Sequence, residues 1–87
     1  MQNDIPQLRE QINQLDTEVV RLLNERAKVA QQIGEIKKAG GADIYDPARE
    51  RDVLDHVNEL NEGPLSKGAI EEIYATIMTA TRELESS

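Results

Sequence analysis

Residues 4–38 read DIPQLREQINQLDTEVVRLLNERAKVAQQIGEIKK, and this stretch decides the fold. Its apolar residues recur at alternating steps of three and four, which is the heptad pattern of a helix with one apolar seam. The seam consists of Ile5, Leu8, Ile12, Leu15, Val19, Leu22, Val29, Ile33 and Ile36. One seam position carries Arg26 instead, and a cation in an apolar seam is costly unless an anionic group meets it.

The composition is that of a small helical bundle. The chain has 87 residues, no Phe, no Trp and only two tyrosines, so a core must be built from Leu, Ile, Val and Ala. We expect a single domain over residues 1–87, too small for more than a marginal core of its own. The net charge of −7 argues against nucleic-acid partners and against anionic membrane surfaces. Because there is no cysteine and no apolar run long enough to span a bilayer, we expect a cytoplasmic location.

The first predicted helix has clear start and stop signals. Asp4 can cap its free amide groups, and the helix should run to about Lys38 before the pair Gly40-Gly41. Gly34 lies inside this helix, where glycine costs about 1 kcal/mol relative to alanine. Either this cost is simply tolerated, or another part of the protein approaches the backbone there.

Two shorter helices should follow. Asp46-Pro47 is a cap followed by proline at the first helical position, and this helix should end near Leu60. Ser66 can cap a third helix that reaches to about Leu84. We therefore predict an all-α fold of one long and two shorter helices.

The length of the first helix suggests more than one chain. It should be roughly 50 Å long, whereas a compact domain of this size has a radius of gyration near 12 Å. The two shorter helices could cover the seam, and so could a second copy of the chain. We expect both, and hence a homodimeric helical bundle.

Five polar residues fall on helix faces that should point inward: Arg26, Lys37, Glu50, Thr81 and Glu85. They could form a buried network in which Arg26 pairs with Glu50 or Glu85. Alternatively, they could line a pocket for a small polyanion, because the guanidinium fork of arginine matches a carboxylate. Arg26 and Lys37 should point nearly the same way, roughly 16 Å apart along the helix.

Arg9 precedes Arg26 by 17 residues, which places it about 25 Å away along the helix and some 100° around it. One straight helix cannot bring both arginines to one small ligand. If Arg9 serves the same pocket, it must come from a second chain.

Other chemistry finds little support in the sequence. His56 is the only histidine, so no Ser-His-Asp set and no cluster of transition-metal ligands is available. Glycines lie at turns or within a helix, so no phosphate-binding loop is visible. We expect neither a metal nor a cofactor.

Several segments resemble the all-helical chorismate mutases. They include Leu8-Arg9-Glu10, Leu22-Leu23-Asn24-Glu25-Arg26, Ile33-Gly34-Glu35-Ile36-Lys37 and Asp46-Pro47-Ala48-Arg49-Glu50-Arg51. The resemblance covers nearly the whole chain, and the order and spacing of its charged residues are specific. It implies an intertwined homodimer that rearranges chorismate, a dicarboxylate, to prephenate in aromatic amino-acid biosynthesis, without a cofactor.

The resemblance also implies roles for the cations. Arg26 would hold one substrate carboxylate, and Arg9 of the other subunit would hold the second. Lys37 would reach the ether oxygen, where negative charge develops as the C–O bond breaks, and a carboxylate. Arg49 would support this region.

The remaining roles concern oxygen-bearing side chains. By resemblance, Asp46 and Glu50 would bind the ring hydroxyl, and Thr81 would lie near a carboxylate. The family often has Gln where this chain has Glu85, donating an amide hydrogen bond to the ether oxygen. Glu85 must therefore be protonated to help, or it takes no part.

Two further readings remain. Domains of this kind are also found fused to aromatic-pathway enzymes, so the chain could be a regulatory module that binds chorismate or prephenate with little turnover. It could also be a plain dimeric bundle with buried ion pairs. Turnover by the purified chain separates the enzyme from both.

Overall fold

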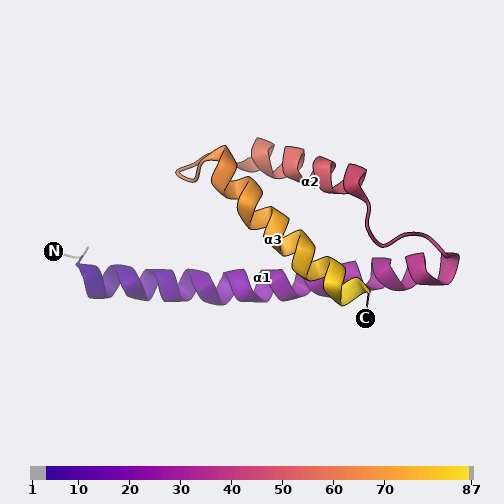
Figure 1. Cartoon of the computed structure of the whole chain (residues 1–87). Coiled ribbons are helices and arrows are strands. Elements are labelled where there is room, and N and C mark those ends of the chain that lie inside the picture. The colour runs from indigo at the N-terminus through magenta and orange to yellow at the C-terminus, as the bar shows by residue number, and fades with distance from the viewer. Residues whose placement is uncertain (1–3, 87) are drawn as a thin grey trace.

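The computed structural model describes residues 4–86 and contains three helices, α1 (Ile5–Gly40), α2 (Pro47–Leu60) and α3 (Lys67–Glu85). Figure 1 shows α1 as a rod along the whole length of the molecule, with α2 and α3 forming a hairpin over its middle. The all-α prediction of one long and two shorter helices is confirmed.

Local capping explains where α1 begins and ends. Asp4 Oδ1 accepts a hydrogen bond from the Gln7 amide at 3.0 Å, so one of the free first-turn amides is satisfied. At the other end Gly41 has φ 74°, a left-handed conformation that glycine adopts without steric cost. The Ala42 amide then donates to the Lys37 carbonyl at 2.8 Å, and the chain leaves the helix.

The caps of α2 and α3 were also readable from the sequence. Asp46 Oδ1 accepts from the Arg49 amide at 3.1 Å, and Ser66 Oγ accepts from the Ala69 amide at 3.1 Å. Between the two helices, Asn61 Nδ2 donates to the Leu65 carbonyl at 2.8 Å and closes the turn. The predicted boundaries are confirmed to within two residues.

The packing of the three helices corrects one expectation. We expected both shorter helices to cover the seam of α1, but within residues 4–86 only α3 contacts α1, and α2 contacts only α3. The core lies between α2 and α3, where Val53, Val57 and Met78 are buried. Because α2 uses its apolar face against α3, it has none left for α1.

Most of the α1 seam is therefore uncovered in one chain. Its nine apolar residues are between 40% exposed at Leu8 and 72% exposed at Ile36. The molecule measures 59 × 23 × 15 Å, and its radius of gyration is 16.3 Å, well above the value of about 12 Å for a compact domain of this length. An apolar stripe of this length on a monomer marks an interaction surface.

None of the described helices is both long enough and apolar enough to cross a membrane. Their exposed apolar residues lie along stripes and alternate with charged ones.

Candidate active site

A cavity of about 350 Å³ lies where the C-terminal half of α1, the start of α2, the end of α3 and the loop 42–46 meet. This volume falls in the range of small-molecule sites. The polar residues that line it are Arg26, Lys37, Asp46, Arg49, Glu50, Thr81, Arg82 and Glu85. The remaining wall is apolar, formed by Val29, Ala30, Ile33, Ile44, Val53 and Met78.

Two cations come from α1. The Arg26 guanidinium carbon lies 6.0 Å from the centroid of the Tyr74 ring, and Arg26 makes no ion pair with any described residue. Lys37 Nζ lies 3.5 Å from the Ile44 carbonyl oxygen, a long and weak hydrogen bond. Both side chains are thus half-buried without a carboxylate partner, which is the state that favours an anionic ligand.

Glu50 has a different partner from the one that the sequence suggested. Its Oε2 lies 2.9 Å from Arg82 Nε, and Arg26 pairs with neither Glu50 nor Glu85. The alternative of a buried network built on Arg26 is therefore wrong for the described chain. Arg82 itself was missed in the sequence, although it follows Met78 by four residues and so shares its helix face.

Glu85 is positioned by close packing between α1 and α3. Gly34 is buried, and a Cβ atom built on it would lie 3.0 Å from Glu85 Cβ and 3.3 Å from Glu85 Cα. These separations are shorter than ordinary contacts between carbon atoms. The glycine inside α1 is thus explained by the approach of another segment, and this approach places Glu85 at the cavity.

Three further predicted residues reach the same cavity. Thr81 is buried, and its hydroxyl donates to the Ile77 carbonyl at 2.7 Å, so only its acceptor lone pairs are left for a ligand. Asp46 is exposed and already accepts from the Arg49 amide as the cap of α2. Arg49 is exposed at the rim of the cavity, and its guanidinium group makes no ion pair with any described residue.

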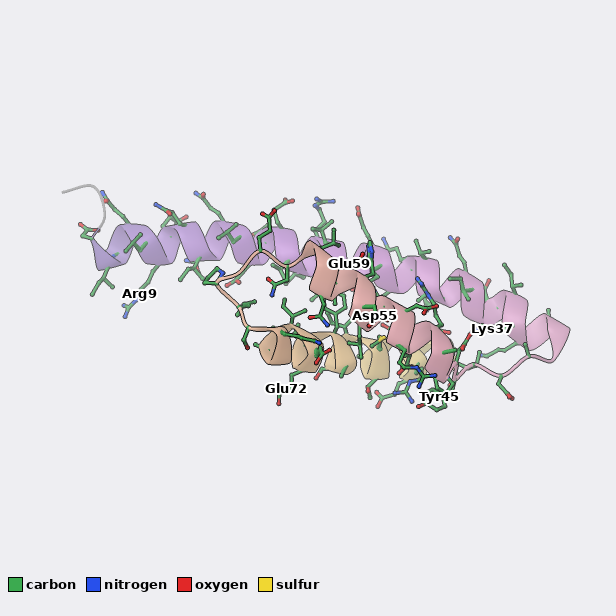
Figure 2. The ribbon with its side chains drawn as sticks, turned by 90° about the horizontal axis from the view of Figure 1, so that it is seen from above. Arg9, Lys37, Tyr45, Asp55, Glu59 and Glu72 are labelled. Carbon is green, nitrogen blue, oxygen red and sulfur yellow. The ribbon has the colours of Figure 1, made fainter. Side chains whose placement is uncertain are left out.

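Arg9 is the one predicted residue that the single chain does not bring to the cavity. It is exposed on α1 near the N-terminal end, whereas Lys37 and Tyr45 both lie toward the other end of the molecule, as Figure 2 shows. This separation agrees with the helical geometry that ruled out a contact between Arg9 and Arg26 in one straight helix.

The cavity offers four cations, three carboxylates and one hydroxyl on an apolar floor. One cation and one carboxylate neutralise each other in the Arg82–Glu50 pair. The other charges leave an excess of positive charge toward α1, suited to a small ligand with carboxylates. Within residues 4–86, no group of three His, Cys, Asp or Glu side chains lies close enough together to hold a metal ion.

A protein-family model described as chorismate mutase type II matches residues 8–86. The chain belongs to this family. The resemblance drawn from the spacing of its charged residues is thereby confirmed.

Individual relatives agree with the family match. The chain is 40% identical over 86 residues to the bifunctional chorismate mutase/prephenate dehydratase of Aquifex aeolicus, covering 94% of this chain and 24% of that protein. It is 38% identical over 64 residues to the intracellular chorismate mutase of Mycobacterium tuberculosis, covering 74% of this chain and 59% of that protein. The chain thus spans about a quarter of the length of the bifunctional relatives that it matches.

A solved structure of a chorismate mutase has the same fold. Chorismate mutase (form II) from Thermus thermophilus superimposes with a TM-score of 0.92 at 33% identity, covering 94% of this chain and 93% of that one. Nearly the whole chain therefore follows the path of a solved chorismate mutase.

Proposed function

We propose that this chain is a chorismate mutase, which converts chorismate to prephenate. The observation that carries the proposal is the pair of half-buried cations, Arg26 and Lys37, that face one small cavity without carboxylate partners in a type II family member. A dicarboxylate substrate supplies the negative charge that these residues lack.

The reaction is a unimolecular rearrangement in which one C–O bond breaks and one C–C bond forms. It requires no nucleophile and no proton transfer, which fits a cavity whose residues offer neither a Ser-His nor a Cys-His pair. Catalysis then depends on two effects: holding the enolpyruvyl arm folded over the ring, and stabilising charge on the ether oxygen.

The cations divide these tasks. Arg26 holds a substrate carboxylate in a two-pronged contact, and Arg49 adds positive charge at the rim. Lys37 gives up its long hydrogen bond to the Ile44 carbonyl and donates instead to the ether oxygen of the substrate and to a neighbouring carboxylate. The bond that Lys37 gives up is weak, so the exchange costs little.

The oxygen-bearing side chains fix the other end of the ligand. Glu50 accepts the proton of the ring hydroxyl, and Asp46 lies beside the same hydroxyl group. The Thr81 hydroxyl turns its proton from the Ile77 carbonyl to a substrate carboxylate. Glu85 lies at the end of α3, where it reaches the ether oxygen when its carboxyl group is protonated.

We further propose that two chains intertwine and that Arg9 of the partner chain completes each site. The support is the apolar seam of α1, which stays exposed along its whole length in one chain. A second α1 would bury it by heptad packing. We place this homodimer in the cytoplasm, in aromatic amino-acid biosynthesis, as suits a cysteine-free chain with an intracellular mycobacterial relative.

The test is the loss of chorismate absorbance when the purified chain is added. We expect saturable turnover, and we expect Arg26→Ala to reduce kcat/KM by at least about a hundredfold, the order of loss of a charge-assisted contact to a substrate carboxylate. Circular dichroism should show that this variant keeps its helices. Absence of turnover by the unaltered chain would contradict the proposal.

A second candidate has specific support because several relatives are bifunctional proteins that this chain covers only in part. The chain could then serve as a binding module for chorismate or prephenate. Saturable binding of prephenate in calorimetry, combined with negligible chorismate turnover, would select this function.

A further inference from the structure

Arg82 lies between the cavity and a second, open depression of the surface. It lines the cavity on one side and, together with Tyr45, an open depression of the outer surface on the other. Its side chain is 35% exposed, and that of Glu50, its ion-pair partner, is 23% exposed. Arg82 is thus the only cavity cation within residues 4–86 that is already paired with a carboxylate.

Three parts of the chain hold this side chain. Arg82 Nε lies 2.9 Å from Glu50 Oε2, off the line of a hydrogen bond, so the contact is chiefly an ion pair. Its guanidinium carbon lies 4.5 Å from the centroid of the Tyr45 ring, well within the range of a cation–π contact. One turn away, Arg82 Nη2 donates to Thr79 Oγ1 at 3.3 Å. A long, flexible side chain is therefore fixed in one place.

We propose that Arg82 is a positioning residue, which acts on the substrate through Glu50. It holds Glu50 Oε2, and so leaves the other carboxylate oxygen to accept from the ring hydroxyl of the ligand. The inference rests on the proposed function, because it assigns Glu50 a contact with chorismate.

The charges of the cavity explain why such a residue is needed. Arg26 and Lys37 line the same small space as Glu50 and have no carboxylate partner of their own. An unrestrained Glu50 could turn toward them and take the place of the substrate carboxylates. Arg82 prevents this competition by neutralising Glu50 from the far side.

The aromatic residues support this arrangement. The chain has only two, and each lies over an arginine of the cavity: Tyr45 over Arg82 at 4.5 Å and Tyr74 over Arg26 at 6.0 Å. Tyr45 is 54% exposed, so its ring adds little to the core. Its structural role is therefore the contact with Arg82.

The first experiment measures steady-state kinetics with chorismate for Arg82→Met, Arg82→Lys and the matched control Arg51→Met. Arg51 is an exposed arginine of α2 outside the cavity. We expect Arg82→Met to lower kcat/KM about tenfold, mainly through a higher KM, because competition by Glu50 weakens binding of the substrate. Arg82→Lys should recover part of the loss, and Arg51→Met should change nothing.

The second experiment shows whether Arg82 acts through Glu50. In a double-mutant cycle, Arg82→Met should have little effect in a Glu50→Gln background, because the neutral amide no longer competes for the cations. If the loss of kcat/KM in the double variant equals the product of the losses in the two single variants, the proposal is overturned. An unchanged KM for Arg82→Met would overturn it as well. Tyr45→Ala should raise KM in the same direction as Arg82→Met, whereas Tyr45→Phe, which keeps the ring face, should not.

Stability measurements separate the contact from the function. At fixed protein concentration, the Arg82→Met and Glu50→Gln shifts in Tm should be less than additive if the pair exists. Additive shifts would overturn the contact itself. If the unaltered chain does not consume chorismate, the proposed function is wrong, and so is the role of Arg82 in it. The Tm measurements would still show whether Arg82 and Glu50 form an ion pair.

Discussion

The charged residues of the cavity differ in how they are held. Glu50 and Arg82 neutralise each other, and Asp46 caps α2, whereas Arg26 and Lys37 have no carboxylate to neutralise them. A folded protein keeps unpaired half-buried cations only where something else compensates their desolvation. The ligand proposed here supplies that compensation when it binds.

Glu85 carries the first residue-scale prediction. An ionised carboxylate beside the ether oxygen raises the barrier to bond breaking, because that oxygen gains negative charge in the transition state, whereas a protonated carboxyl or an amide donates a hydrogen bond and lowers it. Glu85→Gln should therefore raise kcat/KM near neutral pH, by roughly tenfold for one hydrogen bond to a charged oxygen.

The measurement is kcat/KM against pH for both proteins. The value for Glu85→Gln should stay the higher one across the neutral range, because an amide is a hydrogen-bond donor at every pH. Profiles of the same shape and height would exclude Glu85 from the mechanism.

Residues of the site differed in how far the sequence could reveal them. Arg26 was identifiable because it interrupts an apolar seam, which is a purely local signal. Arg82 gave no such signal, since arginine near the end of a helix is normally solvated surface, and its partners Glu50 and Tyr45 are distant in sequence. Only the fold of the α2–α3 hairpin brings these three together.

At the scale of helices, local chemistry set the boundaries and long-range packing set the arrangement. The caps Asp4, Asp46 and Ser66 act within three residues of themselves and were readable in advance. Hydrophobic periodicity predicts that a helix has an apolar face but not which helix covers it. This is why the expectation that α2 would lie on α1 was wrong.

The close approach of α1 and α3 gives an element-scale prediction at Gly34. Replacing Gly34 by alanine gains about 1 kcal/mol of helix propensity but inserts a Cβ 3.0 Å from Glu85 Cβ and 3.3 Å from its backbone. Overpacking of this kind costs about 1–3 kcal/mol, so the net change in the free energy of unfolding should be small and unfavourable. Chorismate turnover should fall severalfold, because the end of α3 carries Thr81 and Glu85 into the cavity.

Gly68→Ala is the matched control, since a Cβ at this second residue of α3 meets nothing within 4 Å. Chemical denaturation should show it to be as stable as the original chain or more so, with unchanged kinetics. If Gly34→Ala behaves like Gly68→Ala in both measurements, the packing of α3 on α1 does not control the site.

For the whole molecule, the main fact is how much apolar surface one chain leaves uncovered. Within residues 4–86 the buried core consists of only three hydrophobic side chains, while the seam of α1 stays exposed over a molecule 59 Å long. A domain this small rarely reaches useful stability on such a core alone. Pairing of two α1 helices would bury the seam and provide the missing stabilisation.

The last prediction concerns the composite site that such a dimer would form. Arg9 is remote from the cavity of its own chain, so it can serve only the cavity of a partner. Arg9→Ala and Arg26→Ala chains should each be nearly inactive alone. In a mixed dimer, one site carries both substitutions and the other carries neither. Random exchange of equal amounts gives half mixed dimers, each with one intact site, so about a quarter of the original activity should return.

Exchange must first be demonstrated, for example by mass spectrometry of the intact dimers after the subunits have been dissociated and reassociated. Mixing each variant with the unaltered chain provides the reference for full exchange. If mixed dimers form and the mixture stays as inactive as its parents, Arg9 and Arg26 do not meet across the interface. The seam would then explain dimerisation alone, and the second substrate carboxylate would have to be held within one chain, where Arg49 is the unpaired cation at the cavity rim.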